Sequence, residues 1–186
     1  VTIQQMGFTE SKPSPLEAVL APDEEQVLVV LIPKPESRSF QYGFKTQYSP
    51  GNAFAIHDDS YIYTLPYPND VSYRVDQGYQ GTYTHQGRNA LAFNMEEGSI
   101  ITAIRPGRVM EVEENNKRGC PDPKCMEWSN YVRIEHEDGS VANYAHLQKN
   151  GALVEVGDLV ALGDEIGLSG STGWASGPHL HLEVYT

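Results

Sequence analysis

The sequence has little positive charge, few cysteines and no long apolar run. Lys and Arg together number 13 against 25 Asp and Glu, which leaves a net charge of −12 over 186 residues. Without a cluster of Lys or Arg, nucleic acids and anionic membrane surfaces are poor partners. The longest apolar run, residues 27–32, has six residues and is too short for a transmembrane helix.

Neither the length nor the composition indicates a disordered chain. A chain of 186 residues predicts one domain, or one domain with a small companion. Such a chain buries enough surface that neither a metal nor a disulfide is required for folding. Hydrophobic residues make up 39%, and the 17 Gly bring the apolar share close to that of ordinary globular proteins.

The two cysteines, Cys120 and Cys125, lie in a proline-rich segment. Pro121 and Pro123 stand between them and favour a tight loop that a disulfide would close. A zinc site would need a second pair of Cys or His nearby in the sequence, and there is none. We therefore expect a disulfide, which indicates the periplasm or the cell exterior. Two free thiols are the alternative.

Helical signals are scarce, whereas short strand-like segments recur along the sequence. No long stretch repeats apolar residues with the 3.6-residue period of a helix. Turn sequences such as Pro-Gly and Asp-Gly separate many of the segments. The sequence therefore predicts an all-β protein with short strands and many hairpins. The expected strands are residues 27–32, 61–65, 100–104, 108–113, 131–136, 141–145 and 179–184.

A cluster of Pro, Asn and Asp over residues 66–76 predicts a domain boundary. We expect residues 1–70 to form an N-terminal extension and a small β module, and residues 71–186 to form the main domain. Every dense motif lies after the boundary. We therefore expect the small β module to serve in packing or positioning rather than in catalysis.

Two of the six histidines, His179 and His181, occupy alternate positions of the expected last strand. Alternate residues of a strand share a face, so both imidazoles lie on one side and the apolar residues between and after them on the other. Two imidazoles on one face, beside the Gly-rich loop at residues 169–178, are a start for a metal site. An exposed strand face fits the same pattern.

Further segments extend this pattern at residues 84–89 and 143–147, each with one histidine. Together with the Gly-Pro-His-Leu-His run at residues 177–181, they resemble the lysostaphin/LytM-type zinc metallopeptidases, which cut peptidoglycan peptides. The resemblance extends from about residue 77 to residue 184. It implies an antiparallel lysostaphin-type peptidase domain with its cleft across one face of the sheet.

The resemblance implies a role for each of four histidines. His85 matches the first zinc ligand of the family, and His181 matches the last. His146 and His179 match the two non-ligand histidines that flank the metal-bound water and the scissile carbonyl. In the intact family site, Zn²⁺ lowers the pKa of its water towards about 7 and polarises the carbonyl. The two other histidines share the proton transfer and the stabilisation of the oxyanion.

The remaining family ligand is an Asp that this sequence lacks. The family pattern Asp-aromatic-x-Met-Pro-x-Gly-Thr aligns with residues 92–99, where Phe93 and Met95 help to fix the register and Ala92 takes the Asp position. Asn94 is a poor substitute, because on a strand its Cα lies about 6–7 Å further along. Its neutral amide is also a weaker zinc ligand than a carboxylate. We expect weak zinc occupancy and little turnover.

Four other residues complete the expectations for the site and its surroundings. Trp174, in the loop before the histidine pair, is a candidate for the wall of a peptide groove. Tyr144 is a second candidate, because it lies two residues before His146 on the expected strand. His57 and His136 fall in expected turns, so we expect them at the surface.

The resemblance implies a zinc-dependent endopeptidase that hydrolyses the cross-linking peptides of bacterial peptidoglycan, impaired here by Ala92. The location implied is the periplasm or the cell exterior. The alternative is a non-catalytic pseudopeptidase that binds the cell wall or regulates an amidase partner. A third candidate is a general secreted protease of glycine-rich proteins. Restoring the Asp separates the first two, because a silenced enzyme regains activity and a regulator does not.

Overall fold

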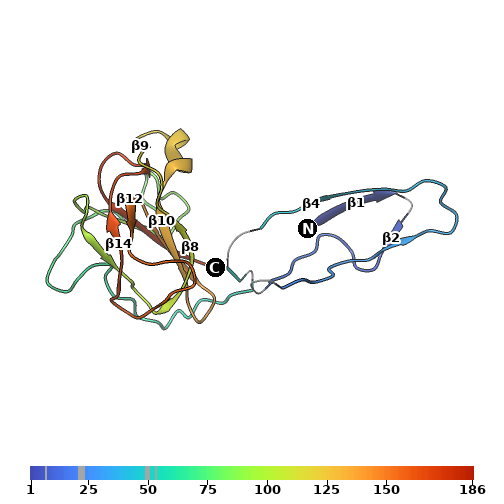
Figure 1. Ribbon diagram of the computed structural model, residues 1–186, viewed down its shortest axis with the longest axis horizontal. Helices are drawn as coiled ribbons and strands as arrows, with labels where there is room; N and C mark the ends of the chain where they lie inside the picture. The colour runs from blue at the N-terminus through green and yellow to red at the C-terminus, as the bar shows by residue number, and fades with distance from the viewer. Residues whose placement is uncertain (7, 21–23, 49–50, 53) are drawn as a thin grey trace. The chain divides into compact units, whose positions relative to one another are not determined.

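The computed structural model describes residues 1–6, 8–20, 24–48, 51–52 and 54–186 (Figure 1). The chain divides into two compact units, Val1–Phe54 and Ala55–Thr186. Regular structure in the described ranges is nearly all strand, with one 3₁₀ helix, η1 (Pro123–Trp128). The prediction of an all-β protein is therefore confirmed. No helix in the described part of the chain is long and apolar enough to cross a membrane.

The first unit holds two small antiparallel pairs. Its strands are β1 (Thr2–Met6), β2 (Phe8–Glu10), β3 (Leu31–Pro33) and β4 (Gln41–Lys45). β1 pairs with β4, and β2 pairs with β3. The strand expected at residues 27–32 forms only at its end, within β3. Every residue of β4 is exposed, and no described residue of this unit is buried, so its described part has little apolar core.

A seven-stranded antiparallel sheet forms the frame of the second unit. Its strands are β5 (Val75–Gln77), β6 (Ala90–Phe93), β8 (Gly107–Glu113), β10 (Tyr131–Glu135), β11 (Val141–Ala145), β13 (Leu159–Val160) and β16 (Leu180–Tyr185). They lie in the order β13-β8-β10-β11-β16-β6-β5. Burial alternates along β10, where Val132 and Ile134 are fully buried and their neighbours are half-buried. One face of the sheet therefore covers the core, and the other is free to line a site.

The remaining strands of this unit are β7 (Ile100–Thr102), β9 (Gly119–Cys120), β12 (Leu147–Ala152), β14 (Glu165–Ser169) and β15 (Gly173–Trp174). β12, β14 and β7 form a three-stranded antiparallel sheet, and β9 pairs in parallel with β15. The apolar core takes side chains from both larger sheets, such as Ile101, Leu147 and Ile166 from one and Phe93 and Leu180 from the other. Five expected strands, from residue 100 onward, form to within two residues.

The division between the units lies earlier than the expected boundary, so residues 55–70 belong to the second unit. Tyr67 is buried in its core, and Tyr63 packs against the same cluster. The backbone N–H of Asp58 donates to the carboxylate of Asp138 at 2.8 Å. Residues 61–65 form no strand and instead run as an irregular segment over the domain. These contacts with residues far away in the sequence explain why the boundary lies before residue 55 rather than near residue 70.

His136 was expected at the surface, and the structure corrects this: it is 3% exposed. Its Nδ1 lies 2.9 Å from the carbonyl of Pro106. Burial lowers the pKa of His136, which keeps the ring neutral at pH 7. The ring is covered because the hairpin end packs beneath Tyr63, whose ring centroid is 6.4 Å away. His57 is partly exposed and lies 2.8 Å from the carboxylate of Asp59.

Cys120 and Cys125 form a disulfide, as expected, and Cys125 is fully buried. The loop that the disulfide closes leads into η1. Asp122 caps this helix, because its side chain accepts a hydrogen bond from the N–H of Lys124 at 3.0 Å. Through the pairing of β9 with β15, the same loop supports Trp174, which is opposite Cys120 in register.

Candidate active-site cleft

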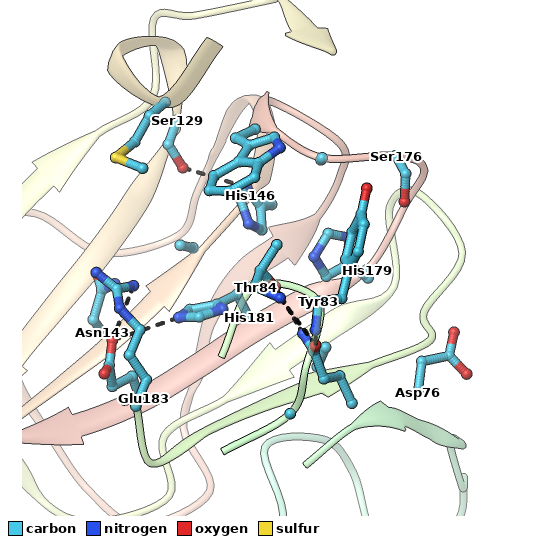
Figure 2. Close-up of a pocket in the computed structure, with 18 of the residues that line it drawn as sticks. Asp76, Tyr83, Thr84, Ser129, Asn143, His146, Ser176, His179, His181 and Glu183 are labelled. Atoms are coloured by element: carbon cyan, nitrogen blue, oxygen red, sulfur yellow. Dashed lines mark hydrogen bonds and ion pairs between the residues drawn. The ribbon is translucent and has the colours of Figure 1, made fainter. Parts of the chain in front are cut away.

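Four histidines from three segments lie together in the second unit, and Figure 2 shows three of them, His146, His179 and His181. His146, His179 and His181 line a cleft of about 1340 Å³. His85 is buried behind them, with its ring centroid 5.0 Å from that of His181. The ring of His146 is centred 4.6 Å from that of His179 and 5.9 Å from that of His181. The structure thus brings together all four histidines selected from the sequence.

His181 is positioned by β16, with small residues on both neighbouring strands. Its register partners are Ala145 on β11 and Ala92 on β6. The Nε2 of His181 lies 3.6 Å from the carboxylate of Glu183, which is two residues further along the strand and shares its face. Glu183 was not selected from the sequence, although this spacing was a signal that could have identified it.

His146 lies between β11 and β12, at a φ of 70°. Such a left-handed backbone is uncommon for a residue other than glycine and marks a constrained position. The Nδ1–H of His146 donates to the carbonyl of Thr172 at 2.7 Å. His179 is held similarly, with its Nδ1 2.9 Å from the carbonyl of Gly177. Each ring therefore keeps its Nε2 available for a substrate or a proton.

Tyr144 does not line the cleft, contrary to the expectation. Its side chain is fully buried, and its hydroxyl accepts a hydrogen bond from the N–H of Ile104 at 3.0 Å. The expectation assumed that strand alternation continued to His146. Because β11 ends at Ala145 and the backbone turns at His146, Ala145 and His146 both line the cleft, while Tyr144 faces the core. Trp174 does line the cleft.

The loop that carries His85 is organised by Gln77, a residue with no distinctive sequence signal. The side-chain oxygen of Gln77 accepts hydrogen bonds from the N–H groups of Tyr83 at 2.9 Å and Thr84 at 3.0 Å. His85 follows directly, and its Nδ1 lies 3.0 Å from the carbonyl of Gly78. These contacts hold the His85 ring in the position beside His181.

The pKa values of His85, His146 and His179 are lowered, which favours the neutral forms of these three rings. Burial, and then the nearby His179, lower the pKa of His146 to about 3. Burial likewise lowers the pKa values of His85 and His179. Desolvation disfavours the charged imidazolium, so these rings are neutral at pH 7. A neutral imidazole accepts a proton or binds a metal.

The side chains present do not make a complete zinc site. Tetrahedral zinc sites use three or four protein ligands, and the position opposite His181 holds the methyl group of Ala92. Asn94 is exposed, and its Nδ2 donates to the carboxylate of Asp76 at 2.7 Å, so its amide is engaged away from the histidines. Across the described ranges, no three or more His, Cys, Asp or Glu side chains are arranged to hold a metal ion.

Comparison with known proteins places this region among the peptidases. The family model described as peptidase family M23 matches residues 83–186, which is more than half of the chain. The matched region begins at Tyr83, just before His85, and includes His85 and the three histidines that line the cleft.

Individual relatives are similar over part of their length. The peptidoglycan DD-endopeptidase ShyB of Vibrio cholerae is 34% identical over 125 residues, which cover 63% of this chain and 26% of that protein. An uncharacterized metalloprotease of Buchnera aphidicola is 38% identical over 101 residues, covering 54% and 23%. The chain thus spans about a quarter of these curated relatives. The lysostaphin catalytic domain of Staphylococcus simulans aligns with a TM-score of 0.44 at 27% identity, covering 67% of this chain and 79% of that one.

Proposed function

The chain belongs to peptidase family M23, and from this membership we propose that its cleft binds the peptides of bacterial peptidoglycan. The relative named as a peptidoglycan DD-endopeptidase supports this substrate class. Trp174, Met126 and Tyr83 on the cleft walls offer apolar and aromatic surface to a peptide. The neutral His146 and His179 offer proton acceptors at the centre.

We propose further that this chain is an endopeptidase whose metal site is impaired. The observation that carries this proposal is the register pairing of His181 with Ala92. The retention of all four histidines supports descent from an active zinc site. With an alanine methyl in place of a carboxylate, His85 and His181 are the two ligands that remain. We therefore expect weak zinc binding and little hydrolysis.

The alternative is a pseudopeptidase that binds the cell wall or regulates an amidase without cutting peptides. The same missing ligand favours it, because a binding cleft can persist without a metal. A place outside the cytoplasm, in the periplasm or secreted, suits both functions, and the Cys120–Cys125 disulfide supports an oxidising compartment.

One paired experiment separates these functions. Zinc content and hydrolysis of purified peptidoglycan are measured for the chain as it is, for Ala92→Asp and for Ala92→Asn, which has a similar shape without the charge. The impaired peptidase predicts about one zinc and measurable hydrolysis for Ala92→Asp alone. If Ala92→Asp binds zinc but leaves peptidoglycan uncut, the regulator is favoured. If no variant binds zinc, the proposed metal site is wrong.

A further inference from the structure

A second row of polar side chains crosses the sheet beside the histidines. Glu111, Arg133, Asn143 and Glu183 are successive register partners on β8, β10, β11 and β16. The row lies two residues along the strands from the row that contains His181, a distance of about 6–7 Å on the same face. Asn143 and Glu183 lie near His181 in Figure 2. A peptide that ran from the histidines along the strand direction would cross this row.

Arg133 is the cation in this row, and three neighbours hold its guanidinium in place. Its Nη1 donates to the carboxylate of Glu111, and its Nε donates to the Oδ1 of Asn143 at 3.3 Å. The guanidinium carbon lies 4.3 Å from the centre of the Tyr131 ring. The side chain is 26% exposed and lines the cleft. Its Nη2 has no hydrogen-bond partner within the described ranges.

Arg88, the other arginine that lines the cleft, is arranged differently. Its side chain is half-exposed and its Nη1 lies 3.5 Å from the carboxylate of Glu183, and no aromatic ring stacks on its guanidinium within the described ranges. Arg133 is instead stacked and anchored, with donors that remain available. A guanidinium fixed in this way is suited to a planar carboxylate, which accepts two hydrogen bonds from it.

We propose that Arg133 is a specificity-determining residue that binds a free carboxylate of the peptide in the cleft. The inference rests on the proposed function, because it takes a peptide to be the occupant. An extended peptide advances about 3.3 Å per residue. The carboxylate would therefore lie about two residues along the peptide from the bond at the histidines, or on a side chain between that bond and this point. The substrates favoured are acidic peptides.

The test uses two synthetic stem peptides that differ only in one group, a free carboxylate or a primary amide. Affinities are measured by fluorescence anisotropy for the whole chain. We expect the carboxylate peptide to bind about 10-fold more tightly, since a charged hydrogen-bonded pair is stronger than a neutral one. Arg133→Gln should remove this preference and leave the affinity for the amide peptide unchanged. Arg108 donates to the carbonyl of Gly157 and does not line the cleft, so Arg108→Gln removes the same charge elsewhere and should retain the preference.

A second variant keeps the test decisive if Arg133→Gln fails to fold. Glu111→Gln removes the anion that competes for Arg133, so the preference for the carboxylate peptide should rise about 3-fold. A merely structural role for the pair would not produce a gain. Equal binding of both peptides by the unmodified chain overturns the Arg133 subsite and leaves the proposed function standing. If neither peptide binds, the proposed function and the subsite both fail.

Discussion

His181 lies directly opposite Ala92 in the antiparallel pair of β16 and β6. Ala92 is 7% exposed and lines the cleft beside the imidazole. On the other side of His181, the register partner Ala145 is also small. The centre of the cleft therefore has room for a longer side chain. A carboxylate introduced at position 92 would lie beside the imidazole of His181, which is itself in contact with the ring of His85.

Restoring the carboxylate should make the stability of the chain depend on zinc. For Ala92→Asp, zinc at about 100-fold above its Kd should raise the Tm by about 5–10 °C, because a ligand that binds only the folded state stabilises it by mass action. The unmodified chain and Ala92→Asn should shift by less than about 2 °C. Calorimetry with and without a chelator measures this. An equal shift in all three proteins would mean that zinc binds through other residues.

Replacing Tyr144 by Phe should affect stability and leave peptide binding unchanged. The loss of the hydroxyl leaves the buried N–H of Ile104 without an acceptor, which costs about 1–3 kcal/mol. Urea unfolding measures the change. Tyr131→Phe on the neighbouring strand is the matched control, because Tyr131 is half-buried in the cleft and we expect a change below about 0.5 kcal/mol. Weakened peptide binding in Tyr144→Phe would contradict its assignment to the core.

The parts of the site that depend on local spacing could be predicted from the sequence. His179 and His181 lie on one face because alternate strand residues do so. The disulfide follows from two cysteines that bracket a short proline-rich loop. The resemblance then identified His85 and His146, and the structure places His146 in the cleft and the ring of His85 against that of His181.

The errors arose where one backbone torsion or a distant contact decides the outcome. Tyr144 was misplaced because the left-handed φ of His146 ends the strand alternation. His136 was misplaced because Tyr63 covers it, a contact between segments assigned to different domains. The environment of Arg133 likewise depends on the register of four strands, which the sequence alone does not specify.

The disulfide should contribute modestly to stability, because it closes a short loop. Cys120 and Cys125 are five positions apart, and the chain-entropy account gives about 2 kcal/mol for a loop of this size. The double variant Cys120→Ser/Cys125→Ser should lose that amount in urea unfolding. A dithiol reductant should destabilise the unmodified chain to the same degree and leave the double variant unchanged. Equal sensitivity of both proteins to the reductant would show that it acts elsewhere.

Asp138 links the irregular segment before the main sheet to the hairpin of β10 and β11. Its carboxylate pairs with Arg105 at 2.7 Å and accepts hydrogen bonds from the N–H of Asp58 at 2.8 Å and the hydroxyl of Ser140 at 2.6 Å. Burial opposes its ionisation, but these donors outweigh burial and hold the pKa of Asp138 well below its usual range. Asp138→Asn should therefore cost roughly 2–4 kcal/mol at pH 7, since it leaves Arg105 buried without its partner.

The pH dependence of the stability lost in Asp138→Asn shows whether Asp138 acts through its charge or through its shape. Because the folded-state pKa of Asp138 is depressed, its stabilising effect is complete above the unfolded-state pKa of about 3.9 and is lost as the pH falls towards the folded-state value. The stability difference between the unmodified chain and Asp138→Asn should thus be constant from about pH 7 to pH 5 and shrink below about pH 4. Urea unfolding at each pH measures it, with the fully exposed Asp59→Asn as control. A difference that persists unchanged to pH 3 would show that Asp138 stabilises the fold by packing rather than by its charge.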